Sequence, residues 1–109
     1  PYETGKNNTN LNFQMAPGSS PMQWINTIQG AVVPQLESFA PDFLLISAGF
    51  DAHRLDPLGN QLLESRHFGE ITRLIKHIAG ARTISFLEGG YHLGALGESV
   101  AEHVQALME

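Results

Sequence analysis

Hydrophobic and polar positions along the chain mark out three short strands. Phe43 to Ile46 form an uninterrupted apolar run, which predicts a buried strand. Residues 83–87 form a second run of strand-forming side chains, while residues 11–15 alternate apolar with polar side chains. Strict alternation is typical of a strand with one buried face. We therefore expect strands in these three places.

Helical periodicity fills the intervals between the strands. Ser20 as N-cap, Pro21 at the first position and Gln23 in a capping box predict a helix start. Gly30 and Pro34 interrupt the apolar face that follows, so we expect a kink near residue 30.

Two further helices are expected in the second half of the chain. Ser65 is placed to cap a helix that runs through Ala79. A closing helix follows residue 92, because apolar side chains recur there at three- and four-residue intervals. The stripe of this helix consists of Leu93, Leu96, Val100, Val104 and Leu107.

The order β-α-β-α-β-α predicts a single α/β domain over residues 1–109. Such an order gives a three-layer α/β/α piece with a mostly parallel sheet and right-handed crossovers. A length of 109 residues and a hydrophobic content of 42% fit one small globular domain.

Charge and cysteine content narrow the classes of function. A net charge of −5 with only 6 Lys and Arg residues argues against nucleic-acid binding through phosphate contacts. The absence of cysteine excludes disulfides and thiolate metal sites, which fits a cytoplasmic location. No apolar run approaches the ~20 residues that a membrane-spanning helix needs, so we expect no membrane partner.

The candidate chemistry lies where the strands end. Asp51 comes after the small residues that follow the first strand, and Tyr91 follows the turn Glu88-Gly89-Gly90 after another strand. In open parallel sheets, ligands gather outside the carboxyl ends of the strands. If the two strands are parallel, Asp51 and Tyr91 lie at the same edge of the sheet. The long loop over residues 49–64 is expected to be functional or mobile, and Asp56 and Pro57 are expected to fix it.

Each of these residues has a simpler structural interpretation. Asp51 could hydrogen-bond within its own loop, and Tyr91 could be an ordinary half-buried aromatic residue. Gly89 and Gly90 could form a plain turn.

Five histidines complete the set of candidates. His53 follows Asp51 by two residues, but alternate residues of an extended strand point to opposite faces, so it is not expected to share a metal with Asp51. His92 is not expected to bind metal either. His67, His77 and His103 fall on predicted helices and are expected at the surface.

Two motifs in this sequence resemble a known family. They are PDFLLISAGFDAHRLDPLG at residues 41–59 and ISFLEGGYHLGALGESV at residues 84–100. Together they resemble the C-terminal part of the histone deacetylase superfamily, above all its bacterial acetoin-utilisation and acetylpolyamine-amidohydrolase members. TGKNNTNLNFQMAPGSS at residues 4–20 resembles an earlier strand of that family more loosely. The resemblance implies a partial arginase/deacetylase-like fold and a C-terminal fragment of a catalytic domain. The start at Pro1 without methionine indicates a fragment, a processed product or a trimmed form.

The resemblance also implies roles for five residues. Asp51 corresponds to a carboxylate ligand of a catalytic zinc ion, and zinc accepts carboxylate oxygen readily. Tyr91 corresponds to the tyrosine whose hydroxyl polarises the scissile carbonyl and stabilises the oxyanion. Gly89 and Gly90 would line the floor of the substrate tunnel. Leu58 would form an apolar wall of the acyl-lysine channel, and a core leucine is an equal alternative.

The implied reaction is hydrolysis of an acetylated amine, such as acetyl-lysine or an acetylpolyamine. The family's mechanism also needs an Asp-x-His zinc pair and a tandem histidine dyad, which in the family lie upstream of the region matched here. This sequence contains no His-His pair and, beyond Asp51-Ala52-His53, no second motif that resembles those ligands. Two hypotheses follow. The chain is the C-terminal portion of a zinc-dependent deacetylase-like amidohydrolase, or it is a truncated, catalytically silent α/β module. A module of this kind is expected to self-associate through an exposed sheet edge or apolar face.

Overall fold

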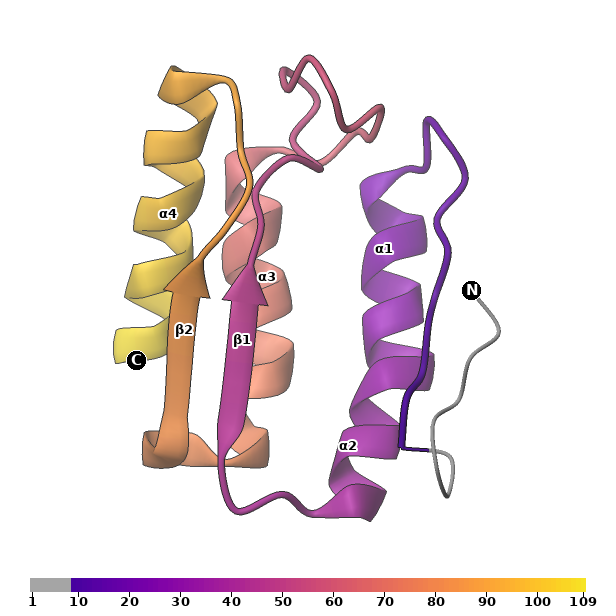
Figure 1. Cartoon of the computed structure of the whole chain (residues 1–109), viewed down its shortest axis with the longest axis vertical. Coiled ribbons are helices and arrows are strands. Elements are labelled where there is room, and N and C mark those ends of the chain that lie inside the picture. Colours follow the sequence, from indigo (N-terminus) through magenta and orange to yellow (C-terminus); the bar gives the residue numbers. More distant parts are fainter. Residues whose placement is uncertain (1–8) are drawn as a thin grey trace.

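The structure is a computed structural model that describes residues 9–109 (Figure 1). None of the helices within these residues is both long and apolar enough to cross a membrane. The elements in chain order are α1 (Pro21–Thr27), the π-helical turn η2 (Ile28–Val32), α2 (Val33–Phe39), β1 (Leu44–Ala48), α3 (Ser65–Ile75), the 3₁₀ turns η3 (Lys76–Ile78) and η4 (Gly80–Arg82), β2 (Thr83–Leu87) and α4 (Leu93–Met108).

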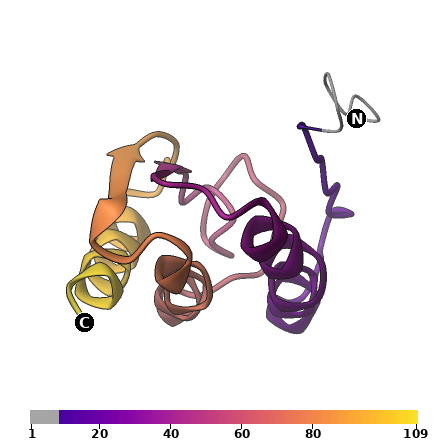
Figure 2. The same cartoon turned by 90° about the horizontal axis from the view of Figure 1, so that it is seen from below.

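Strands β1 and β2 form a parallel sheet. Their register runs from Leu44 opposite Thr83 to Ala48 opposite Leu87, and α3 lies in the connection between them. Seen from below, the helices lie on one side of this sheet (Figure 2). The α/β class with a parallel sheet is therefore confirmed. Of the three expected layers, residues 9–109 provide the sheet and one layer of helices.

The start of α1 and the interruption after it agree with the sequence. The Gln23 amide N–H donates to Ser20 Oγ at 3.2 Å, and the Ser20 N–H donates to Gln23 Oε1 at 2.7 Å, which completes the capping box. The kink expected near residue 30 takes the form of the π-helical turn η2. Pro34 follows at the start of α2, where its missing N–H removes a helical hydrogen bond.

Two expected elements differ from the structure. Residues 11–15 form no strand, because neither β1 nor β2 pairs with them. Residues 4–8 of the loosely matching segment lie outside the described residues. Helix α3 has Glu64, not Ser65, as its N-cap and ends at Ile75. The Glu64 N–H donates to His67 Nδ1 at 2.9 Å, so this capping box uses an unusual pair of residues.

The core lies between β1, the loop after it and α3. Phe50 is its centre and packs edge-on against Phe68, with the ring centroids 5.1 Å apart. Ala48, Ala52 and Leu63 complete the buried cluster. Helix α3 approaches α4 closely at Gly69, where a Cβ atom would lie 3.2 Å from the Glu102 carbonyl oxygen. Packing of these helices therefore depends on the absence of a side chain there.

The apolar stripe predicted for α4 is only partly correct. Leu96 and Val100 pack against the core, but Leu93 is 81% exposed and Val104 is also exposed. The residues that α4 buries are small or polar: Ala95, Ser99, His103 and Ala106. Which residues of α4 are buried therefore depends on their contacts with neighbouring elements and not on hydrophobicity alone.

Candidate active site

Two loops leave the carboxyl edge of the sheet side by side. The parallel pairing continues past both strands, because the Glu88 N–H donates to the Ala48 carbonyl at 2.9 Å. The Phe50 N–H then donates to the Gly89 carbonyl at 2.8 Å. These bonds hold the loop after β1 against the loop after β2, directly before Asp51 and Tyr91.

Asp51 and Tyr91 converge on Gly89. A Cβ atom on Gly89 would lie 3.2 Å from Asp51 Oδ2 and 3.5 Å from the Tyr91 hydroxyl oxygen. A Cβ atom on Gly49 would lie 3.3 Å from Asp51 Oδ1. The carboxylate and the phenol are thus brought together across the two loops, as expected for parallel strands, and glycines leave the space around the carboxylate open.

The environments of the two side chains leave both available for chemistry. Tyr91 is 56% exposed and is not part of the buried core cluster. Within residues 9–109 the Asp51 carboxylate has no hydrogen-bond partner. A second carboxylate, that of Asp56, makes the loop contacts that the simpler interpretation gave to Asp51.

Asp56 fixes the long loop, as expected. Its Oδ1 accepts from the N–H groups of Leu58 at 2.8 Å and Gly59 at 3.2 Å, and its Oδ2 accepts from the Tyr91 N–H at 2.8 Å. Partial burial acts to raise the pKa of Asp56, but these three N–H groups and nearby His92 outweigh it and lower the pKa below its ordinary 3.8. The folded loop therefore favours the ionised carboxylate.

Glycines allow the close approaches that this arrangement needs. A Cβ atom on Gly59 would overlap the carbonyl oxygen of Asp51. Gly90 has a φ of +138°, and a Cβ atom there would lie 2.8 Å from Leu96 Cδ1. A non-glycine residue at either position would displace the loop that carries Asp51 or the loop that carries Tyr91.

Leu58 lies on the same loop with a side chain that is 67% exposed. The alternative that Leu58 is a core residue is therefore wrong. Its expected place in a substrate channel, and that of Gly89 and Gly90, stay predictions.

Three histidines near the site bind protein atoms with their ring nitrogens. His53 Nδ1 accepts from the Leu55 N–H at 3.1 Å, and its Nε2 lies 3.1 Å from Ser65 Oγ. Burial, and then the charge of Arg54, lower the pKa of His53 below 6.5. His92 Nδ1 caps α4 by accepting from the Ala95 N–H, and His67 caps α3. These contacts occupy both ring nitrogens of His53 and the Nδ1 atoms of His67 and His92.

His103 contradicts the expectation that helical histidines lie at the surface. It is buried at 6% exposure, as is His67 at 7%. Thr72 Oγ1 donates to the Phe68 carbonyl at 2.6 Å, so it accepts from His103 Nδ1–H, 2.7 Å away. His103 Nε2 then accepts from Ser85 Oγ at 2.8 Å. Burial lowers the pKa of His103 below 6.5, in agreement with a neutral ring.

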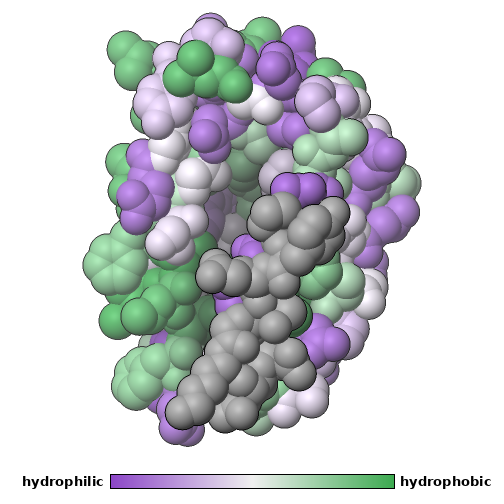
Figure 3. All heavy atoms as spheres, turned by 45° about the vertical axis from the view of Figure 1, so that its right-hand side comes forward, coloured by the Kyte–Doolittle hydropathy of each residue, from purple (hydrophilic) through white to green (hydrophobic). Residues whose placement is uncertain are grey.

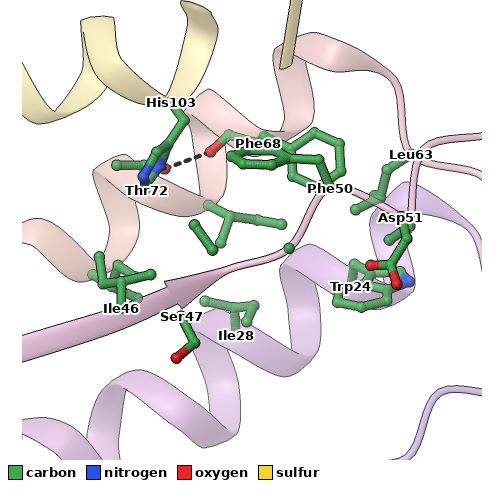
Figure 4. Close-up of a pocket in the computed structure, with 15 residues that line it drawn as sticks. Trp24, Ile28, Ile46, Ser47, Phe50, Asp51, Leu63, Phe68, Thr72 and His103 are labelled. Atoms are coloured by element: carbon green, nitrogen blue, oxygen red, sulfur yellow. Dashed lines mark hydrogen bonds between the residues drawn. The ribbon is translucent and has the colours of Figure 1, made fainter. Parts of the chain in front are cut away.

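An apolar cavity of about 190 Å³ lies beneath the site. Figure 4 shows Asp51 beside Trp24 and Leu63 at one end of it, and His103 with Thr72 at the other. Trp24 is held there by a hydrogen bond from its Nε1 to Gln61 Oε1 at 2.9 Å. Asp51 therefore lies between exposed Tyr91 and an apolar interior.

The described residues do not by themselves make a zinc site. A catalytic zinc ion usually has three protein ligands. Within residues 9–109 no group of three or more His, Asp or Glu side chains is placed to hold a metal ion. Asp51 can supply one carboxylate ligand, and the other ligands would have to come from outside these residues.

The fold and the two loops define an α/β domain with a carboxylate and a phenol at the carboxyl edge of a parallel sheet. The histone deacetylase domain family matches residues 2–107, and the chain belongs to this family.

Among curated relatives, histone deacetylase 14, chloroplastic, of Arabidopsis thaliana is 40% identical over 104 residues, which cover 92% of this chain and 25% of that protein. Polyamine deacetylase HDAC10 of Homo sapiens is 42% identical over 77 residues, which cover 71% of this chain and 12% of that protein. The solved HDA15 HD domain is 33% identical with a TM-score of 0.81, over 85% of this chain and 26% of that one. The chain thus spans only 25% and 12% of the length of these two curated relatives.

Proposed function

We propose that this chain contributes the carboxylate and the phenol of a zinc-dependent site that hydrolyses acetylated amines. Family membership supports a deacetylase-type hydrolase. The observation that carries the proposal is the convergence of Asp51 and Tyr91 on Gly89. The substrate class is an acetyl-lysine or acetylpolyamine-type amide, and HDAC10 is named as a polyamine deacetylase.

In this proposal each residue has a separate task. The exposed Tyr91 hydroxyl donates a hydrogen bond to the carbonyl oxygen of the amide, and this bond strengthens as negative charge develops there. Asp51 serves as one zinc ligand, together with ligands from outside the described residues. Leu58 forms an apolar wall, and Gly89 and Gly90 form the floor, of the channel that holds the acetylated amine.

The test is amide hydrolysis. The chain is incubated with a fluorogenic acetyl-lysine peptide and with N-acetylputrescine, each with and without added zinc. Activity that needs zinc, that Asp51→Asn abolishes and that Tyr91→Phe lowers by a factor of about 10²–10³ supports the proposal. Activity that Tyr91→Phe leaves unchanged contradicts the role of the phenol.

A catalytically silent module is the second candidate, and the missing ligand set within residues 9–109 favours it. Leu45, Ile84 and Phe86 lie exposed on the sheet face without helices, and Figure 3 shows hydrophobic residues gathered at the lower left of its view. Self-association through this face fits such a module. Absence of both zinc binding by calorimetry and hydrolysis would favour it.

The compartment is a separate matter. The cytoplasmic location expected from the sequence stays a prediction. Two relatives are named as chloroplastic, so a plastid is the alternative. Fractionation of the source cells with an antibody against this chain distinguishes the two locations.

A further inference from the structure

The backbone hydrogen bonds that join the two loops do not reach Tyr91, and Asp56 supplies the contact that does. The continued strand pairing ends at Gly89, whose carbonyl accepts from Phe50. Gly90 follows with a φ of +138°, a conformation that glycine adopts without the restraint of a side chain. Tyr91 is therefore separated by a permissive residue from the pairing that fixes the rest of its loop.

The two oxygens of the Asp56 carboxylate bind different loops. Its Oδ2 accepts from the Tyr91 N–H at 2.8 Å, on the far side of Gly90. Its Oδ1 accepts from the N–H groups of Leu58 and Gly59. Gly59 in turn lies against the Asp51 backbone so closely that a Cβ atom would overlap the Asp51 carbonyl oxygen.

We propose that Asp56 is a positioning residue that sets the Tyr91 hydroxyl relative to the Asp51 carboxylate. Both side chains of the candidate site depend on this one carboxylate, Tyr91 through its N–H and Asp51 through Gly59. The inference rests on the proposed function for its catalytic meaning, but its geometry is measured without any activity.

The isosteric variant Asp56→Asn tests this role. Asparagine keeps one acceptor oxygen and replaces the other by an NH₂ group, so it cannot accept from both loops. Two NMR readouts on the full chain report on Tyr91: hydrogen exchange of its amide, and the nuclear Overhauser contact between its ring and the Gly89 α-protons. Asp42→Asn is the matched control, because it removes the same charge from an exposed residue far from these contacts.

We expect Asp56→Asn to accelerate Tyr91 amide exchange about fivefold, the factor that corresponds to a net hydrogen bond of ~1 kcal/mol. The contact between the Tyr91 ring and Gly89 weakens, while the amides of Phe50 and Glu88 in the strand pairing stay protected. Asp42→Asn changes none of these signals.

Two results overturn the proposal. In the first, amide exchange accelerates at Leu58 and Gly59 while the Tyr91 amide and ring contact are unchanged. This result would mean that Asp56 stabilises only its own loop. In the second, Asp42→Asn has the same effect on Tyr91 as Asp56→Asn. Loss of amide hydrolysis bears on the proposed function and not on these readouts.

If Asp56→Asn does not fold, an acid titration of the wild-type chain tests the proposal instead. The amide proton shifts of Tyr91, Leu58 and Gly59 are then followed through acid titration. Because all three N–H groups bind one carboxylate, they are expected to move with a common midpoint below 3.8. A Tyr91 amide that does not follow the other two overturns the proposal.

Discussion

Both faces of the sheet carry apolar side chains, but helices cover only one of them. The face toward the helices carries Leu44, Ile46, Ala48 and the polar Ser85, whereas the bare face carries Ser47 together with Leu45, Ile84 and Phe86 at 65%, 48% and 52% exposure. Parallel sheets are normally covered on both faces. The apolar side chains of the bare face are therefore available for contact with another molecule. The packing of the covered face depends on hydrogen bonds between polar side chains as well as on buried apolar area.

The polar side chains of the covered face differ in their hydrogen bonding: Ser85 finds a partner on a helix, whereas Thr83 Oγ1 is buried with no partner among the described residues. Ser85 on β2 meets His103 on α4, and His103 meets Thr72 on α3. Burial of such groups is costly unless they are hydrogen-bonded. The network therefore ties three elements together, and the apolar contacts of Phe50 lie next to it, with its ring 5.6 Å from that of His103.

Replacing one phenylalanine on each side of the sheet gives the largest contrast. Phe50→Ala leaves a cavity in the core and is expected to lower the free energy of unfolding by ~3–5 kcal/mol. Phe86→Ala on the bare face is expected to lower it by about 1 kcal/mol or less. Urea unfolding followed by circular dichroism measures both. Equal losses would mean that the bare face is packed in solution.

Two glycines extend the contrast between the interior and the open surface. A Cβ atom on Gly90 would point toward Leu96 and Phe50 at a positive φ, so Gly90→Ala is expected to cost ~1–3 kcal/mol. A Cβ atom on Gly97 in α4 meets nothing within 4 Å, so Gly97→Ala is expected to add ~0.4–1 kcal/mol. The same unfolding measurement checks both. A tolerated Gly90→Ala would show that the turn before Tyr91 adapts.

His103 gives the covered face a dependence on pH. Its pKa is lowered by burial, so below about pH 6.5 the unfolded chain takes up a proton that the folded chain does not. The free energy of unfolding therefore falls as pH falls from 6.5 toward the folded pKa. His103→Asn is expected to cost ~1 kcal/mol at neutral pH and to flatten this slope. His53, whose pKa is also lowered, retains part of it.

Exposed His77 is the control for this experiment. His77→Asn removes a histidine from an exposed site, so the difference between the two variants isolates the effect of burying His103. A slope that His103→Asn does not reduce would show that the ring is protonated in the fold, with both nitrogens donating to hydroxyl oxygens.

The sequence was sufficient for the features that depend on local pattern. The strand runs that begin near residues 43 and 83, the capping box of Ser20 and Gln23 and the interruption near residue 30 are each determined by residues a few positions apart. The approach of Asp51 to Tyr91 followed from one added rule, that parallel strands end at one edge.

Features that depend on distant partners could not be predicted. His103 is buried because Thr72 and Ser85, 31 and 18 positions away, complete its hydrogen bonds. The Asp56 contact to Tyr91 spans 35 positions. Alternation at residues 11–15 indicated a strand, but a strand needs a neighbour to pair with, and none lies there within the described residues.

The smallest change in stability is expected on the bare face, where the effect on association is the informative one. Leu45→Thr with Ile84→Thr places β-branched, strand-forming side chains at both positions, so each is expected to change the free energy of unfolding by about 0.5 kcal/mol or less. Light scattering on a size-exclusion column is expected to show less self-association than for wild type, because the apolar face is interrupted. Met108→Thr, at an exposed site on α4, is the control and is expected to leave association unchanged. A wild-type chain that is monomeric at high concentration would show that the bare face does not bind a second copy, which removes the support for a self-associating module.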